Sequence, residues 1–183
     1  MGMLTEAQRK RLLQIARQSI DAALHGRAVE WKEEDFEEAL RRPAGAFVSL
    51  HTPAGDLRGC IGSIRAMEPL YKAVATSAVS AALRDPRFYP VRVEEMLNLE
   101  VEISVMGPIE TVRNADEIEV GRDGLIISRG RYAGLLLPQV ATEYGWDRQA
   151  FLEQTCAKAG LPAGSWRLPD TRIERFAAEV FSE

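Results

Sequence analysis

The sequence predicts a fold of helices and antiparallel strands in which two β-rich halves share one sheet. Residues 46–61 and 124–137 each combine apolar strand patterns with a central turn, as β-hairpins do, and a helical pattern follows each hairpin. Between them, residues 99–105 alternate apolar and polar side chains, which is typical of an antiparallel strand with one buried face. We therefore expect a single domain, residues 1–183, with an internal duplication whose halves cover about 44–106 and 107–181.

Length and composition are those of a globular protein. The 183 residues are 46% hydrophobic and 27% charged, enough to bury roughly 70% of the unfolded surface without a covalent staple. The net charge of −4 gives no basic surface, so a nucleic-acid partner is not indicated. The sequence shows neither a signal segment nor an apolar run of membrane-spanning length, and we expect a cytoplasmic protein with no membrane partner.

The cysteines and histidines argue against metal and cofactor chemistry in this chain. Cys60 and Cys156 lie in unlike contexts and are expected to be unpaired, as in a reducing compartment. His25 and His51 are the only histidines, which leaves no ligand set for zinc, iron or an iron–sulfur cluster. We predict no metal site and no cofactor.

The elements of the first half follow from periodicity and cap residues. Thr5 is a suitable N-cap for a helix with apolar residues from Leu12 to Leu24, which His25 and Gly26 would end. The acidic segment 33–40 is expected to form a short helix. Residues 46–50 and 57–61 would form the arms of the first hairpin, and residues 70–83 an Ala/Ser-rich helix able to pack closely on a sheet.

The second half repeats this order. Residues 124–128 and 133–137 predict a hairpin, and residues 139–144 and 147–158 predict two helical pieces, the second ended by Gly160. The tail, residues 171–181, is compatible with a strand or a helix, and we favour the strand.

Residues 57–63 contain the most distinctive side chain of the chain, the thiol of Cys60. Strand alternation places Arg58 and Gly62 on the same face, and an arginine beside a thiol favours the reactive thiolate. Gly59 and Gly62 would let a substrate approach the sulfur, and their N–H groups could bind an anion. The alternative is that Cys60 is a small core hydrophobe and the glycines occupy a bulge.

His51 and Cys156 are expected to lie outside the site. With a five-residue loop, His51 faces Leu57 and falls on the sheet face opposite Cys60, unless a bulge shifts the register by one. We therefore expect His51 at the edge of the loop and outside the site. Cys156 belongs to an apolar helical stripe and is expected in the core.

Polar residues from two other segments could complete a pocket. Asp85, Arg87 and Phe88 lie in a loop stiffened by two prolines, and Glu102 and Ser104 occupy the polar face of their strand. One hypothesis brings all five to the face of Arg58 and Cys60. In the other, Asp85 pairs with Arg87 and Glu102 faces solvent.

Five blocks in order along the chain resemble the AMMECR domain family, whose microbial members are also called AmmeMemoRadiSam system protein A. The blocks are Leu57–Ser63, Asp85–Pro90, Glu102–Val105, Leu136–Val140 and Lys158–Leu161. Two positions depart from the usual family pattern, Ser63 in place of threonine and Tyr89 in place of a frequent proline. The match covers nearly the whole chain.

The resemblance implies an α+β fold with an antiparallel, partly barrel-like sheet built from two related halves with flanking helices. It also implies association with a Memo-like protein and a radical S-adenosylmethionine enzyme in the modification of a biomolecule. The family motif assigns the site to residues that do not include His51: Arg58, Gly59, Cys60, Gly62 and Ser63.

Two functions therefore follow from the sequence. In the first, the protein is an enzyme or enzyme component in which Cys60, assisted by Arg58, is the nucleophile or covalent carrier for a small acyl, phosphorylated or nucleic-acid-derived substrate. In the second, it is a non-catalytic binding or adaptor protein of the same system, with a glycine-rich pocket or a surface for the partner enzymes.

Overall fold

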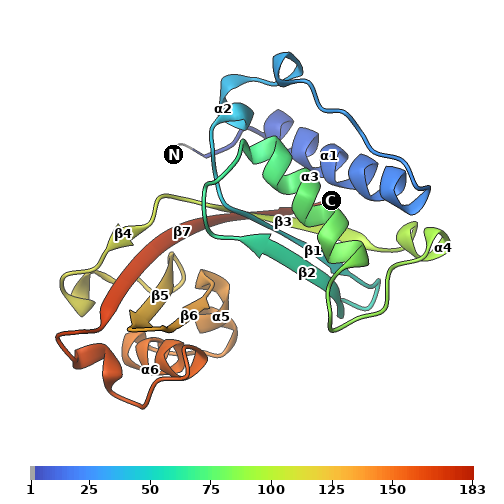
Figure 1. The fold of residues 1–183 in the computed structure, drawn as a ribbon. Coiled ribbons are helices and arrows are strands. Elements are labelled where there is room, and N and C mark those ends of the chain that lie inside the picture. Colours follow the sequence, from blue (N-terminus) through green and yellow to red (C-terminus); the bar gives the residue numbers. More distant parts are fainter. Residues whose placement is uncertain (1–2) are drawn as a thin grey trace. The chain divides into compact units, whose positions relative to one another are not determined.

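The computed structural model describes residues 3–183, which form two compact units (Figure 1). The first unit comprises the chain up to Met106 together with Glu179–Glu183, and the second comprises Gly107–Ala178. All strand pairs within each unit that the structure defines are antiparallel. The predicted α+β fold class with an antiparallel sheet is confirmed. A common origin of two halves stays a prediction.

The first unit packs helices on one face of a sheet. Its strands are β1 (Ala46–His51), β2 (Leu57–Ser63) and β3 (Glu100–Met106), in the order β2-β1-β3, with the end of β7 (Arg172–Ser182) beside β3. β2 is therefore an edge strand. Its helices and 3₁₀ turn are α1 (Glu6–Leu24), the turn Glu33–Asp35, α2 (Glu38–Arg41), α3 (Leu70–Leu83) and α4 (Val93–Met96).

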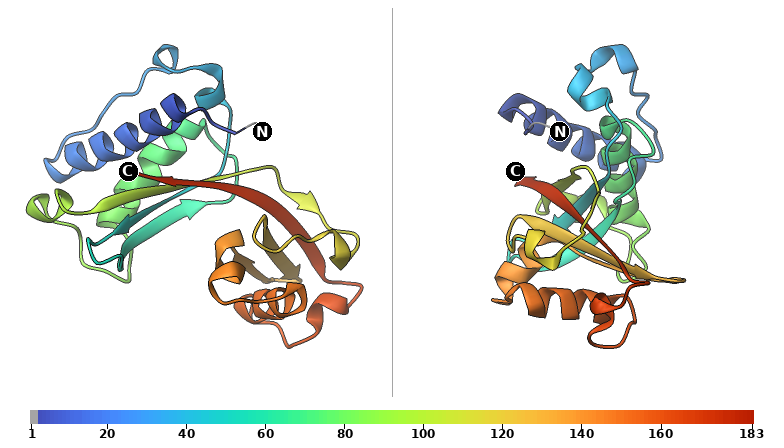
Figure 2. Two further views of the ribbon diagram at one scale, coloured as in Figure 1. Left: turned by 180° about the vertical axis from the view of Figure 1, so that it is seen from behind. Right: turned by 90° about the vertical axis from the view of Figure 1, so that its left-hand side faces the viewer.

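Helix α1 begins and ends as the sequence predicts. Thr5 and Gln8 form a reciprocal capping box, in which the Thr5 hydroxyl accepts from the Gln8 N–H and the Gln8 side chain accepts from the Thr5 N–H. Gly26 follows the helix with a φ of 67°, a conformation that glycine adopts without strain. The apolar stripe of α1 lies in the core, beside α3 and above the sheet (Figure 2).

Close packing between α3 and the sheet depends on small residues. An added Cβ at Gly59 would lie 2.3 Å from the carbonyl oxygen of Ala81 in α3, too close for any side chain. The helix also buries Ala73, Ala78 and Ala82. The Ala-rich sequence of α3 and the glycine in β2 thus bring helix and strand backbones together.

The second unit has its own core and repeats the hairpin–helix–strand order. Its elements are β4 (Glu110–Thr111), the 3₁₀ turn Ala115–Glu117, β5 (Asp123–Arg129), β6 (Tyr132–Leu136), α5 (Pro138–Glu143), α6 (Arg148–Lys158), the 3₁₀ turn Ser165–Arg167 and most of β7. The strands follow the order β6-β5-β7, and β4 pairs with β7. An added Cβ at Gly134 would lie 2.3 Å from the backbone nitrogen of Ala159, just past α6, so Gly134 packs against a helix end as Gly59 packs against α3.

Most expected elements are present, and the differences are confined to short elements. Residues 33–40 do not form one helix, because Phe36 adopts an extended conformation that separates a 3₁₀ turn from α2. Helix α4 was not expected, since four residues are too few to show a helical period. The tail is a strand, as favoured, and Cys156 is fully buried in the core of the second unit. Burial raises the pKa of the Cys156 thiol.

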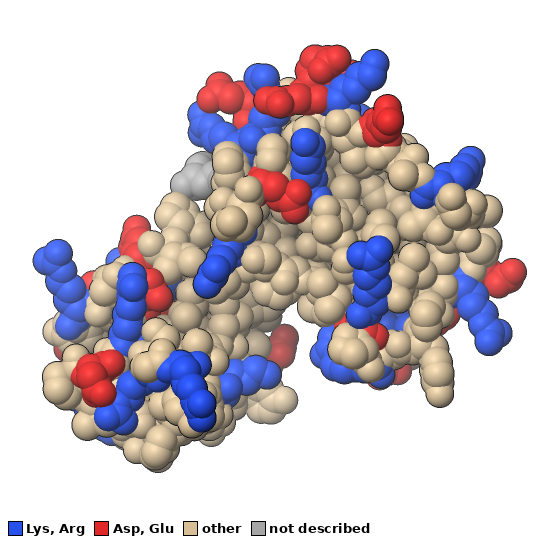
Figure 3. Space-filling view, in the orientation of Figure 1, with Lys and Arg blue, Asp and Glu red and all other residues tan. Residues whose placement is uncertain are grey.

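The surface carries charges of both signs in each unit (Figure 3). No helix within residues 3–183 has the length and apolar character that crossing a membrane requires.

Candidate functional site

Cys60 lies in the middle of the edge strand β2, and two residues of the loop after α3 hold its backbone. Its N–H donates to Asp85 Oδ2 at 2.9 Å, and its carbonyl oxygen accepts from Arg87 Nη2 at 3.3 Å. Edge strands leave such groups unpaired and open to association with another strand. Asp85 and Arg87 therefore close the sheet edge at Cys60 and fix the position of this residue.

The Asp85–Arg87 pair is itself strongly organised. The buried Asp85 carboxylate also accepts from the Arg87 backbone N–H, Nε and Nη2 at 3.1, 3.0 and 2.7 Å. Hydrogen bonding to the Arg87 guanidinium lowers the pKa of Asp85 far below its usual range, and the Cys60 N–H acts in the same direction. The hydrogen bond to Asp85 in turn raises the pKa of Arg87, whose side chain is about half exposed.

Arg58 is held by a partner that the sequence interpretation did not include. Its Nε and Nη2 donate to the two carboxylate oxygens of Glu95 in α4 at 2.5 and 3.1 Å, and its guanidinium lies 5.9 Å from the centroid of the Phe88 ring. The pair lowers the pKa of Glu95. Within residues 3–183, no hydrogen bond joins the Arg58 side chain to Cys60. The carboxylate of Glu95 neutralises the positive charge of Arg58.

A β-bulge corrects the expected position of His51. Leu50 pairs with Gly59 but His51 pairs with Leu57, so Arg58 is an extra residue in β2. Cys60 lies opposite Ser49, and His51 is two residues further along β1 on the same face. The expectation that His51 lies on the face opposite Cys60 is wrong, and the exception stated with it, a bulge that shifts the register by one, is what the structure contains.

Two predicted residues of β3 lie on the Cys60 face but not beside the thiol. Glu102 pairs with Ser49 on the side opposite Cys60, two strand spacings or about 10 Å away. Its Oε1 lies 3.8 Å from Nε2 of His51, a buried ring nitrogen without a hydrogen bond in the described part of the chain. Ser104 is buried and lies one row further along, opposite Phe47.

The glycines and Ser63 have local structural roles. Besides the contact of Gly59 with α3, an added Cβ at Gly62 would lie 2.3 Å from the carbonyl oxygen of Ala46 in β1. The Ser63 hydroxyl accepts from the Arg65 N–H at 3.0 Å in the turn after β2. Participation of these three residues in substrate binding stays a prediction.

The structure therefore brings together five of the ten predicted site residues, namely Arg58, Cys60, Asp85, Arg87 and Phe88. Sequence reasoning missed Ser49 and Glu95, and it placed His51 outside the site. No sequence signal marks the bulge that brings His51 to the face of Cys60, and nothing in the local pattern marks Glu95 as a partner. In the portion of the chain described, no three His, Cys, Asp or Glu side chains are arranged as a metal site.

Comparison with known proteins identifies the family. A family model described as AMMECR1 matches residues 13–181. The chain belongs to the AMMECR1 family. A protein of Thermococcus gammatolerans is 47% identical over 182 residues, covering 94% of this chain and 88% of its own length. A protein of Methanothermobacter thermautotrophicus is 45% identical over 186 residues, covering 98% of this chain and 96% of its own.

A solved AMMECR1-family structure has the same fold. The crystal structure of an uncharacterized protein from Pyrococcus horikoshii, 44% identical, matches with a TM-score of 0.86 over 94% of this chain and 90% of that one. The resemblance seen in the five sequence blocks is thus confirmed at the level of the family.

Proposed function

We propose that this AMMECR1-family protein is an enzyme component that uses the Cys60 thiol as a nucleophile or covalent carrier in the modification of a biomolecule. The observation that supports this best is the clamp on Cys60. Asp85 and Arg87 bind its backbone on the outer side, while its partly exposed side chain lies on the face that also carries His51. A nucleophile held in one position needs little reorganisation before it reacts.

The chemistry would be a group transfer to sulfur. The Cys60 sulfur forms a bond to an acyl carbon or a phosphorus atom, and the leaving group departs with the electron pair of the bond that breaks. The thiol proton passes to a base. His51 is the base nearest in the strand register, and the Glu102 carboxylate beside it would stabilise the imidazolium that forms.

Alkylation of the full-length protein by iodoacetamide tests this proposal. Peptide mass spectrometry would follow Cys60 and Cys156 separately, and Cys156, which is fully buried, serves as an internal reference. We expect Cys60 to react in the folded protein and Cys156 only after unfolding. A Cys60 as inert as Cys156 would contradict the nucleophile role.

Histidine variants then test the base. His51→Gln should slow alkylation of Cys60, because the sulfur would lose the group that takes its proton. His25→Gln is the matched control, since His25 lies at the C-terminal end of α1 and its ring is engaged by Asp21. Equal rates in the two variants would remove His51 from the proposal.

The second candidate function is a non-catalytic adaptor. The charged side chains at the site support this function, because they bind one another and so are not free to bind a substrate. Glu95 binds Arg58, and the Asp85 carboxylate accepts hydrogen bonds from Cys60 and Arg87. An adaptor would bind its partners and support their reaction equally well with Cys60→Ser. Loss of the reaction with retained binding would instead favour the thiol chemistry.

The partners that we propose are a Memo-like protein and a radical S-adenosylmethionine enzyme, in the cytoplasm. Support for them comes from the family membership of the chain. Affinity purification of the tagged full-length protein under native conditions, followed by mass spectrometry, should recover one or both enzymes. Recovery of neither from cells that express both would contradict the partnership.

A further inference from the structure

The first unit contains a groove that has no part in the Cys60 site. It lies between the C-terminal half of α1, the segment 27–30 and helix α4, and its volume is about 790 Å³. Pockets that bind small organic molecules typically have volumes of roughly 300–1,000 Å³. Its apolar lining consists of Ala22, Leu24, Ala28, Val29, Val93, Met96 and Leu97.

The apolar lining is unusually accessible. Leu97 is 85% exposed, Val93 40% and Val29 37%, so three large apolar residues, two from α4 and its C-cap and one from the segment 27–30, leave their side chains open at one groove. Isolated exposed apolar side chains are common, but a concave group of them indicates a binding surface.

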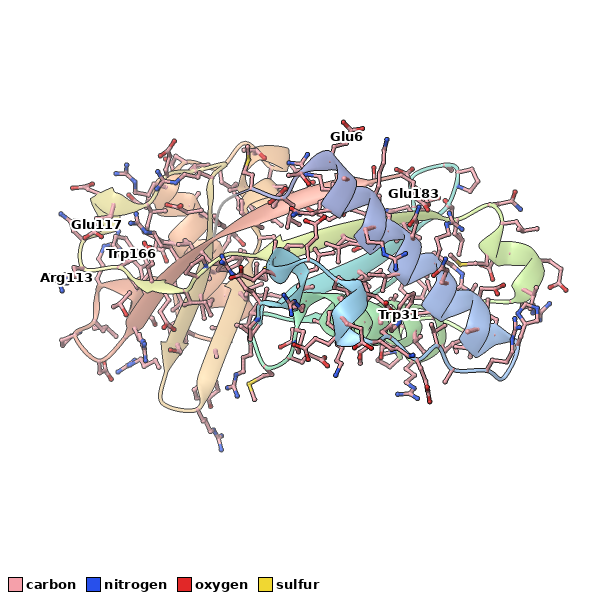
Figure 4. The ribbon with its side chains drawn as sticks, turned by 90° about the horizontal axis from the view of Figure 1, so that it is seen from above. Glu6, Trp31, Arg113, Glu117, Trp166 and Glu183 are labelled. Atoms are coloured by element: carbon pink, nitrogen blue, oxygen red, sulfur yellow. The ribbon has the colours of Figure 1, made fainter. Side chains whose placement is uncertain are left out.

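Arg17 joins the walls of the groove through polar contacts. Its guanidinium donates to the carbonyl oxygens of Met96, at 2.9 Å, and of Leu99, and it pairs with Glu183, which lies against α1 (Figure 4). α1 and α4 are thus connected through one long side chain, and apolar side chains do not fill the space beside it. The groove is therefore formed before any ligand arrives.

The charges at the rim specify the ligand. Arg17 is neutralised by Glu183, and Arg27 pairs with Asp21 at 3.5 Å. Glu30 and Glu94, which also line the groove, form no ion pair with any residue from 3 to 183. An apolar groove with two uncompensated carboxylates fits a cation and disfavours an anion.

We infer that this groove binds a small organic cation with an apolar body. The apolar part lies against Val29, Val93 and Leu97, and the cationic group lies near Glu30 or Glu94. The site does not depend on Cys60 chemistry, because its lining includes none of the residues that hold Cys60.

Titration with two probes of equal length tests the inference. The full-length protein, labelled at Leu and Val methyl groups, is titrated with n-octylammonium chloride and separately with sodium octanoate, both below their micelle concentrations. Octylammonium should shift the methyl resonances of Leu24, Val29, Val93 and Leu97 saturably and bind more tightly than octanoate. Absence of saturable shifts at these methyl groups, or tighter binding of octanoate, would overturn the inference.

Surface variants separate the two contributions. Glu30→Gln with Glu94→Gln should weaken octylammonium binding by about three- to fivefold and leave octanoate no weaker, because exposed ion pairs are worth little individually. Leu97→Ser should weaken octylammonium binding about fivefold through lost apolar contact. Leu168→Ser, at a 40% exposed leucine of the second unit, is the control and should change nothing. Unchanged binding in the glutamine or Leu97 variants would contradict the assignment.

Discussion

Replacement of Asp85 by alanine tests the claim that this carboxylate holds Cys60 in place. The substitution removes the acceptor of the Cys60 N–H and the partner of Arg87. An N–H left without an acceptor costs about 1–3 kcal/mol, toward the lower end where the donor is only partly buried, as at Cys60, and an ion pair with a half-exposed arginine contributes up to about 1 kcal/mol. We therefore expect a loss of about 1–4 kcal/mol in the free energy of unfolding, an appreciable share of the roughly 5–15 kcal/mol typical of folded domains.

Urea denaturation would measure the loss, and amide hydrogen exchange would locate it. The amide of Cys60 should exchange faster in Asp85→Ala, while amides in the core of the second unit should keep their protection. Asp56→Ala is the matched control, because Asp56 is an exposed aspartate in the hairpin loop whose side chain makes no hydrogen bond within residues 3–183, and it should change stability by less than about 0.5 kcal/mol. Unchanged stability and unchanged exchange at Cys60 would refute the claim that Asp85 holds the Cys60 backbone in place.

The stability lost in Asp85→Ala should also depend on pH, and it should decrease as the pH falls. The pKa of Asp85 is lower in the folded protein than in the unfolded chain, where it is about 3.9. Its contribution is therefore complete above about pH 5 and is lost as the pH falls toward the folded-state pKa. The stability difference between the wild type and Asp85→Ala should be constant from pH 7 to 5 and shrink below about pH 4. A constant difference down to pH 3 would contradict the role of the ionised carboxylate.

Two further predictions concern the ion pair of Arg58 and the strand glycines that pack against helix backbone. Arg58→Lys should lower the free energy of unfolding by about 1–2 kcal/mol, because lysine cannot donate to both carboxylate oxygens of Glu95 at once. Thermal unfolding measures this loss. An unchanged melting temperature would show that the pair is dispensable. Gly59→Ala and Gly134→Ala should each cost about 1–3 kcal/mol in urea denaturation, because the new methyl group meets helix backbone such as the Ala81 carbonyl. Gly26→Ala, where nothing lies within 4 Å, should cost about 1 kcal/mol through its positive φ alone, and costs at Gly59 and Gly134 no larger than this would refute the packing argument.

The sequence predicted those helices and strands whose ends and faces depend on residues close together in the chain. The capping residues around α1, the alternation in β1 and β3 and the terminating glycine after α6 all act within a few residues, and each was predicted correctly. The prediction of one helix over 33–40 was wrong although Phe36 and Leu40 have helical spacing, because Phe36 is extended and stacks on Tyr71 of α3. The length of α4 left no pattern to detect.

The candidate site was less predictable because its geometry depends on register and on distant partners. One extra residue, Arg58, reverses the face assigned to His51 relative to Cys60, and no residue in the hairpin announces the bulge. Glu95 lies 37 positions after Arg58 in sequence, so only the folded chain shows that it neutralises the guanidinium. The pairing of Asp85 with Arg87 was one of the interpretations weighed, but its contact with the Cys60 backbone was not.

The most direct test of the proposed function is to look for a covalent intermediate on Cys60. The full-length protein, its copurified partner enzymes and a small-molecule extract of the source cells would be incubated together, quenched with acid and analysed by intact-protein and peptide mass spectrometry. We expect an added mass on Cys60 in the wild type and none in Cys60→Ser, which should still bind the partners. Modification of the biomolecule at full rate by Cys60→Ser, without any adduct on the wild-type thiol, would contradict it.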